Sequence, residues 1–176
     1  MAQHVTELLG AEVAACLAPM SVTLITARDE AGADKVATVA WAMPISHEPS
    51  MLVVAIRPGG QTSEAMERGS FVVNVLPAGS ADIARVCGKK HGIDDRIAQA
   101  GLSLEAGKHV DAARVAQAVS WLECAVEGHE VHGDHELFIA RVLLAETAGR
   151  VEDGVLVAGE PLLIGQRNHF GHFEED

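Results

Sequence analysis

Three apolar, β-prone runs follow one another between Lys35 and Pro77, namely Val36 to Met43, Met51 to Ile56 and Phe71 to Leu76. Two polar connections, ISHEPS and RPGGQTSEAMERGS, separate them. Both are rich in hydroxyl side chains, Gly and Pro, which indicates loops rather than core. Short strands that bring such loops to one edge of a sheet form a suitable site for a phosphate or a polar cofactor tail. This stretch therefore predicts a sheet with a binding site at its edge.

The rest of the chain supplies more short strands. Alternation predicts a strand over Met20 to Ala27, joined through a turn at Gly32 to a second strand, Lys35 to Met43. Further along, alternation around Leu122 predicts another strand, which a tight turn at His132 to Asp134 connects to a long strand over His135 to Thr147. The segment VEDGVLVAGEPLL predicts one or two short strands.

Helices are few and short. Apolar spacing predicts a helix over Val5 to Leu17 that Pro19 stops and that packs across a barrel end. A second helix is predicted over Gln61 to Arg68, with Thr62 or Ser63 as its N-cap and Gly69 at its end.

Two further short helices are predicted, one from Ser80 through Val86 and one in DDRIAQAG, which Gly101 ends. Many short strands with two or three small helices, and no alternating helix–strand rhythm, predict an antiparallel β-barrel. We expect a single domain over residues 1–176.

The amino-acid composition argues against some classes of function. The chain has 13 Lys and Arg against 25 Asp and Glu, a formal net charge of −12, which argues against binding to nucleic acid or to an anionic membrane surface. No run approaches the roughly 18 apolar residues that a membrane span needs. The first ten residues show no basic region followed by an apolar stretch, so no signal peptide is expected and the predicted location is the cytoplasm.

The cysteines and histidines do not predict a metal or disulfide site. Cys16, Cys87 and Cys124 are odd in number and widely spaced, so reduced, buried thiols are expected. A lowered thiol pKa is conceivable only at Cys87, which lies beside Gly88-Lys89-Lys90. His129, His132 and His135 follow one another at a three-residue spacing, which on a strand sends neighbours to opposite faces. No metal is therefore predicted.

Polar residues in the opening stretch are the candidate ligands. Arg57, Gln61, Thr62 and Ser63 offer a guanidinium, an amide and hydroxyls, with Gly59 and Gly60 allowing close backbone approach, as a phosphate monoester requires. The alternative is a solvated loop with a helix cap.

Three other polar residues are open to two interpretations. Thr38 and Ser46 offer hydroxyls, but they are equally a β-former and a turn residue. Asn74 lies in mid-strand, and either a cofactor hydroxyl or a neighbouring backbone group would satisfy its amide.

Four pieces of the sequence, in order, resemble one family. They are LAPMSVTLITARDEAG, the stretch ending in Trp41 with the Pro-x-Ser turn and the loop ending in Thr62, the strand GSFVVNV, and WLECAVEGHEVHGDHELFIARV. Together they are similar to the flavin reductase-like, FMN-binding split barrels. The resemblance extends from about Leu17 to Val142, with a weaker echo in PLLIGQRNHFGHF.

This resemblance implies a mainly β split barrel, Greek-key-like, that forms a homodimer with each flavin near the subunit interface. It places the backbone of Thr38, Val39, Ala40 and Trp41 along the flavin ring. It also suggests that His135 lines the pocket as the catalytic-site residue where nicotinamide stacks. His169, Phe170 and His172 of the C-terminal tail are expected to cover the pocket.

The implied activity is that of an NAD(P)H:flavin oxidoreductase. FMN, with FAD as an alternative, would accept hydride from the nicotinamide, and the reduced flavin would pass to an acceptor or a partner monooxygenase. A non-catalytic flavin- or haem-binding carrier or sensor on the same barrel is the alternative, and a barrel with a decayed site is a third. The chain has no Tyr and only 3% aromatic residues, so a bound flat ring would rest largely on backbone and aliphatic side chains.

Overall fold

A computed structural model describes residues 7–89, 95–153, 155–157, 161–165 and 170–171 of the chain. Its main sheet has seven strands in the order β3-β2-β6-β9-β10-β5-β4, and every neighbouring pair is antiparallel. The strands are β2 (Thr23–Arg28), β3 (Asp34–Val39), β4 (Ala42–His47), β5 (Ser50–Ile56), β6 (Ser70–Val75), β9 (Ser120–His132) and β10 (His135–Thr147). The prediction of a mainly β, antiparallel fold is confirmed.

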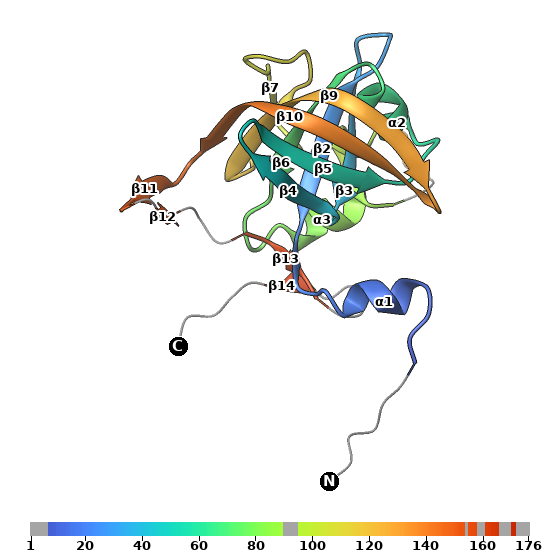
Figure 1. The fold of residues 1–176 in the computed structure, drawn as a ribbon. Helices are drawn as coiled ribbons and strands as arrows, with labels where there is room; N and C mark the ends of the chain where they lie inside the picture. Colours follow the sequence, from blue (N-terminus) through green and yellow to red (C-terminus); the bar gives the residue numbers. More distant parts are fainter. Residues whose placement is uncertain (1–6, 90–94, 154, 158–160, 166–169, 172–176) are drawn as a thin grey trace.

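The two edge strands of this sheet, β3 and β4, are consecutive in the chain and only Ala40 and Trp41 separate them. The chain therefore passes directly from one edge of the sheet to the other, which requires the sheet to curl round on itself (Figure 1). The Ala55 N–H of β5 donates to the Trp41 carbonyl at 2.8 Å, which holds the crossing against β5. The barrel stays open along the line between β3 and β4 because no ladder joins these strands.

The side chains that fill the barrel interior come from every second residue along the strands. Along β5, Leu52, Val54 and Ile56 are buried, whereas Met51, Val53 and Ala55 between them are half-buried on the outer face. Phe71, Val73, Phe138 and Ala140 complete the interior from β6 and β10. Helix α2 (Gln61–Met66) closes one end of this core through Ala65 and Met66.

A second apolar cluster covers the outside of β2 and β3. Helices α3 (Ala81–Cys87) and α4 (Arg96–Gln99) pack there, and residues such as Leu24, Leu76 and Leu162 fill the contact. Smaller pairings complete the fold: β7 (Leu104–Glu105) with β8 (Arg114–Val115), β11 (Arg150–Glu152) with β12 (Val155–Val157), and β13 (Leu163–Ile164) between β1 (Met20–Ser21) and β14 (Phe170–Gly171).

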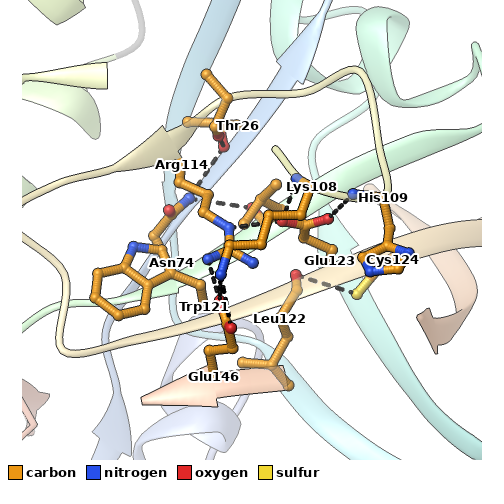
Figure 2. A network of polar contacts seen from close by, with 12 residues as sticks. Thr26, Asn74, Lys108, His109, Arg114, Trp121, Leu122, Glu123, Cys124 and Glu146 are labelled. Carbon is orange, nitrogen blue, oxygen red and sulfur yellow. Dashed lines mark hydrogen bonds and ion pairs between the residues drawn. The ribbon is translucent and has the colours of Figure 1, made fainter. Parts of the chain in front are cut away.

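A buried ion pair fastens the segment before β9 to the sheet (Figure 2). Arg114 Nε donates to Glu123 Oε1 at 2.6 Å, and the same carboxylate accepts the backbone N–H groups of Lys108 and His109. The Arg114 guanidinium also contacts Glu146 of β10. Because the Glu123 side chain is fully buried, these donors replace the water that the carboxylate loses.

Several predicted elements appear with the predicted bounds or close to them. The strand His135 to Thr147 is β10 without change, and its turn with β9 places Gly133 at φ 63°. Helix α2 starts at Gln61, and Gly69 follows it at φ 107°, a conformation that favours glycine. Its N-cap is Gly60 rather than Thr62 or Ser63, and the Ser63 side chain bonds back to the cap.

The predicted strand over Lys35 to Met43 is wrong as a single element. It breaks at Ala40 and Trp41, and the new strand β4 then extends to His47, through residues that were predicted to be a loop. The physical reason is barrel closure, because the chain has to leave one sheet edge and join the other at this point.

The predicted N-terminal helix is also different. Its described part, α1 (Ala11–Ala15), is short and lies outside the barrel in Figure 1. Leu9, Val13 and Leu17 are all more than half exposed, so the described residues do not pack across a barrel end as predicted. Among the residues that the structure describes, none of the helices has the length and apolar character of a membrane span.

Candidate active site

A cavity of about 620 Å³ opens where the barrel is split, a volume within the usual range for small-molecule sites. Its walls come from residues 37–41 of the crossing, residues 55–63 after β5, residues 87–89 at the end of α3, and the side chains of Arg96 and His135. The predicted residues Thr38, Val39, Ala40, Trp41, Arg57, Gln61, Thr62, Ser63 and His135 all line this cavity. The fold therefore brings most of the candidate residues to one place.

Strand β3 presents to the cavity a backbone edge that no other described strand pairs with. The Val36 carbonyl accepts a bond from Arg96 at 3.2 Å, whereas the Val39 carbonyl accepts one from Thr23 of β2. Since backbone groups alternate between the two sides of a strand, Thr38 shares the direction of Val36, away from β2. The Thr38 side chain is already used, because its hydroxyl donates to the Ala84 carbonyl at 2.8 Å.

The loop after β5 forms one end of the cavity. The Ser63 hydroxyl is engaged with the Gly60 backbone, bonding to its N–H at 3.0 Å and to its carbonyl at 2.9 Å. The Thr62 hydroxyl is buried and has no hydrogen-bond partner among the described residues. A buried hydroxyl without a partner is costly in the protein alone, and a ligand oxygen at this wall would satisfy it.

The charge of the cavity contrasts with that of the chain. Arg57, Lys89 and Arg96 line it, and no Asp or Glu is present among its described lining residues. The whole chain nevertheless carries a formal charge of −12. A local concentration of positive charge in an acidic protein favours an anionic ligand.

His135 is the first residue of β10, directly after the β9–β10 turn, and it contacts two neighbours. Its ring lies 4.5 Å from the Trp41 ring, centroid to centroid. Its Nδ1 bonds to Asp134 Oδ1 at 2.7 Å, and the other oxygen of Asp134 pairs with Arg57 at 3.1 Å. The hydrogen bond from His135, followed by the charges of His135 and Arg57, lowers the pKa of Asp134.

Three described candidate residues, Ser46, Asn74 and Phe170, lie outside the cavity lining. Ser46 pairs with Met51 in the β4–β5 ladder. Phe170 belongs to the second apolar cluster, where the Arg85 guanidinium lies 5.0 Å from its ring centre. His169 and His172 are outside the described residues.

Asn74 is fully buried, and its side chain bonds entirely within the protein. Its amide donates to the Thr26 hydroxyl (Figure 2) and to the Leu24 and Val72 carbonyls. Its oxygen accepts the Val115 N–H at 2.8 Å. Of the two kinds of partner left open by the sequence, the structure shows protein groups.

The structure adds residues that the sequence analysis did not select. Lys89 and Arg96 reach the cavity only because α3 and α4 pack against β3, and no local motif marks them. Asp134, which the sequence analysis placed only at the end of a tight turn, connects Arg57 with His135.

The expectations for the thiols need correction. Burial raises the pKa of Cys87 to about 11 and that of Cys124 to about 12, so a lowered pKa at Cys87 is wrong. Cys16 is exposed rather than buried. Within the described part of the chain, no three His, Cys, Asp or Glu side chains are grouped as metal ligands would be.

Comparison with known proteins decides the family. A family model described as a flavin reductase like domain matches residues 16–171. The chain belongs to this family. An NADH-dependent FMN reductase, AsuE2, from Streptomyces nodosus subsp. asukaensis is 30% identical over 154 residues, which are 84% of this chain and 75% of that protein. The chain spans only 40% of another relative, a probable flavin reductase from Rhizobium meliloti.

Solved structures of the same fold agree with this assignment. Flavoredoxin from Methanosarcina acetivorans superposes with a TM-score of 0.81 at 20% identity, covering 100% of this chain and 93% of that chain. The styrene monooxygenase flavin reductase from Pseudomonas putida S12 gives a TM-score of 0.75 at 22% identity, covering 93% and 96%. At these identities the likeness establishes the flavin reductase fold alone.

The residues present suit the flavin that the family implies. An isoalloxazine ring needs backbone donors along one edge, which β3 offers beside the cavity. A phosphate needs positive charge and hydroxyl donors, which Arg57 and the unpartnered Thr62 hydroxyl offer.

Proposed function

We propose that this protein is an NAD(P)H-dependent flavin reductase that uses FMN, with FAD as an alternative flavin. One observation carries the proposal: a single cavity combines the unpaired edge of β3 with a positively charged loop, in a chain of the flavin reductase family. The named relative AsuE2 is an NADH-dependent FMN reductase, which supports the choice of cofactor and reductant.

The lining residues have distinct proposed roles. The backbone from Thr38 to Trp41 orients the flavin ring, and Arg57 with Gln61, Thr62 and Ser63 holds the phosphate. His135, flanked by Trp41, borders the space for nicotinamide. The bound flavin supplies the chemistry by accepting hydride at N5, so the protein has to bind, orient and exclude water rather than provide an acid–base pair.

We also propose a homodimer, supported by an apolar outer face on the β4–β5–β10 part of the barrel. Met43 and Ile139 are 60% and 40% exposed, and both are paired in register with Val53, which lies between them. Residues in register share a face, so these side chains form one row. An exposed apolar row suits contact with a second copy. Sedimentation or light scattering of the purified chain tests this assignment.

The destination of the reduced flavin is proposed from the relatives. One neighbour is the flavin reductase of a styrene monooxygenase, and another relative is a stachydrine N-demethylase reductase subunit. We infer that this protein passes reduced flavin to an acceptor or a partner monooxygenase. We also propose that the chain is a single domain and that it acts in the cytoplasm.

The decisive experiment is a visible absorption spectrum of the protein with one equivalent of FMN, followed by NADH or NADPH under anaerobic conditions. Bleaching of the bound-flavin spectrum supports the reductase. Flavin that binds but stays oxidised with both nicotinamides would reject it in favour of a carrier or sensor. Failure to bind FMN or FAD would reject the flavin site itself.

A further inference from the structure

Asp134 joins two residues that reach the cavity from different elements. Arg57 belongs to the loop after β5, whereas His135 begins β10. Asp134 Oδ1 bonds to His135 Nδ1 at 2.7 Å, and Oδ2 pairs with Arg57 at 3.1 Å. One carboxylate therefore touches both the anion-binding loop and the histidine beside Trp41.

We propose that Asp134 is a positioning residue that couples occupancy of the anion site at Arg57 to the hydrogen bonding and tautomer of His135. The proposal rests on the proposed function, because it takes Arg57 as a ligand for the flavin phosphate. The two oxygens of Asp134 are divided between Arg57 and His135. A phosphate at Arg57 competes with Oδ2 and leaves the carboxylate to His135 alone.

The exposure of the pair makes this exchange feasible. The Asp134 side chain is 70% exposed and that of Arg57 is 54% exposed, so their ion pair is weak and open to displacement. The His135 side chain is only 18% exposed and packs against Trp41. The bond to His135 is therefore the more protected of the two contacts, and it is the one that persists.

The tautomer of His135 depends on the same contact. An ionised carboxylate only accepts hydrogen bonds, so Nδ1 carries the proton that it donates to Asp134. This leaves Nε2 as the ring nitrogen available to a ligand. The coupling thus connects phosphate binding at Arg57 to the ring nitrogen that His135 offers to a ligand.

The sign of the effect on binding follows from charge. Asp134 opposes a phosphate both by repulsion and by occupying Arg57, but it has no such effect on riboflavin, which lacks the phosphate. In Asp134→Asn, the affinity for FMN should rise about three- to fivefold relative to that for riboflavin at low ionic strength. The difference should shrink as salt screens the charges.

The experiment compares FMN and riboflavin titrations, followed by flavin fluorescence, for the wild type, Asp134→Asn and Asp82→Asn. Asp82 forms an exposed pair with Arg85 and does not line the cavity, so its variant controls for the loss of one surface charge. The ring nitrogen resonances of His135, assigned by their absence in His135→Gln, give a second measurement. FMN and riboflavin should shift them differently in the wild type and alike in Asp134→Asn.

The results that would contradict the coupling differ from the result that would contradict the proposed function. A weaker affinity for FMN in Asp134→Asn, or an equal change for FMN and riboflavin, would show that Asp134 merely supports the loop and would overturn the coupling. A change of the same size in Asp82→Asn would also overturn it. Wild-type protein that binds neither flavin would instead reject the proposed function.

Discussion

The rings of Trp41 and His135 lie 4.5 Å apart, centroid to centroid, at an interplanar angle of 35°. Trp41 belongs to the two-residue crossing that closes the barrel, and His135 begins β10, which pairs with β5 in the sheet. Both residues line the cavity, so their contact forms part of its wall.

We expect Trp41→Leu to lower kcat/KM for NADH about three- to tenfold, because His135 loses an aromatic neighbour worth about 0.5–1.5 kcal/mol. Stability should change little, since Trp41 is 42% exposed. Steady-state kinetics of NADH oxidation with FMN measure the effect. Trp121→Leu is the matched control, because Trp121 donates to the Val115 carbonyl away from the cavity and its loss should affect folding instead.

Thr62→Val tests the phosphate assignment. The Thr62 hydroxyl has no partner among the described residues, so replacing it by a methyl should leave the free energy of unfolding unchanged or raise it by about 1 kcal/mol. FMN affinity should fall several-fold, as measured by titration.

Thr23→Val provides the contrast. The Thr23 hydroxyl is buried and donates to the Val39 carbonyl at 2.8 Å, so its removal should cost about 1 kcal/mol of stability with little effect on FMN. Unchanged FMN affinity in Thr62→Val would remove Thr62 from the phosphate site.

Asn74→Ala should lower the free energy of unfolding by about 2–4 kcal/mol, because several buried protein groups lose their partner at once. FMN affinity of the folded variant should be unchanged, since Asn74 does not line the cavity. Urea unfolding and flavin titration measure the two quantities separately. Lost flavin affinity at unchanged stability would instead make Asn74 a cofactor ligand.

Stability should fall in acid through Glu123. Burial alone would raise the pKa of this carboxyl, but the backbone N–H groups of Lys108 and His109, with Arg114, outweigh it and the net pKa is lowered. A carboxyl with a lowered folded pKa contributes stability above its unfolded pKa of about 4.3, and that contribution is lost as the pH falls through the folded pKa.

Urea unfolding between pH 7 and pH 3 measures this dependence, with Glu123→Gln as the variant. The variant should lose about 3 kcal/mol or more at pH 7, because it removes the buried charged partner of Arg114 and leaves only the part-exposed Glu146. Its stability should also change less steeply with pH. A wild-type slope that the variant reproduces would exclude Glu123 as the titrating group.

The sequence by itself determined the elements whose signals are local. The β9–β10 hairpin follows from the alternation around Leu122 and the tight turn at His132 to Asp134, and the end of α2 follows from Gly69, which tolerates the left-handed backbone. The motifs in their order also indicated the flavin reductase family, which the family comparison confirms. These signals are readable because each depends on residues close together in the chain.

Only the tertiary structure decided where the β3–β4 crossing falls, which partners Asn74 has, and that Arg96 and Asp134 belong to the cavity region. The crossing depends on closing seven strands into a barrel, and no residue near Ala40 encodes that closure. The pKa of Cys87 is likewise set by the packing of α3 against the barrel and not by the neighbouring lysines in the chain. The chemistry of each side chain can be read from the sequence. Its burial and its neighbours depend on contacts between segments that are far apart in the chain.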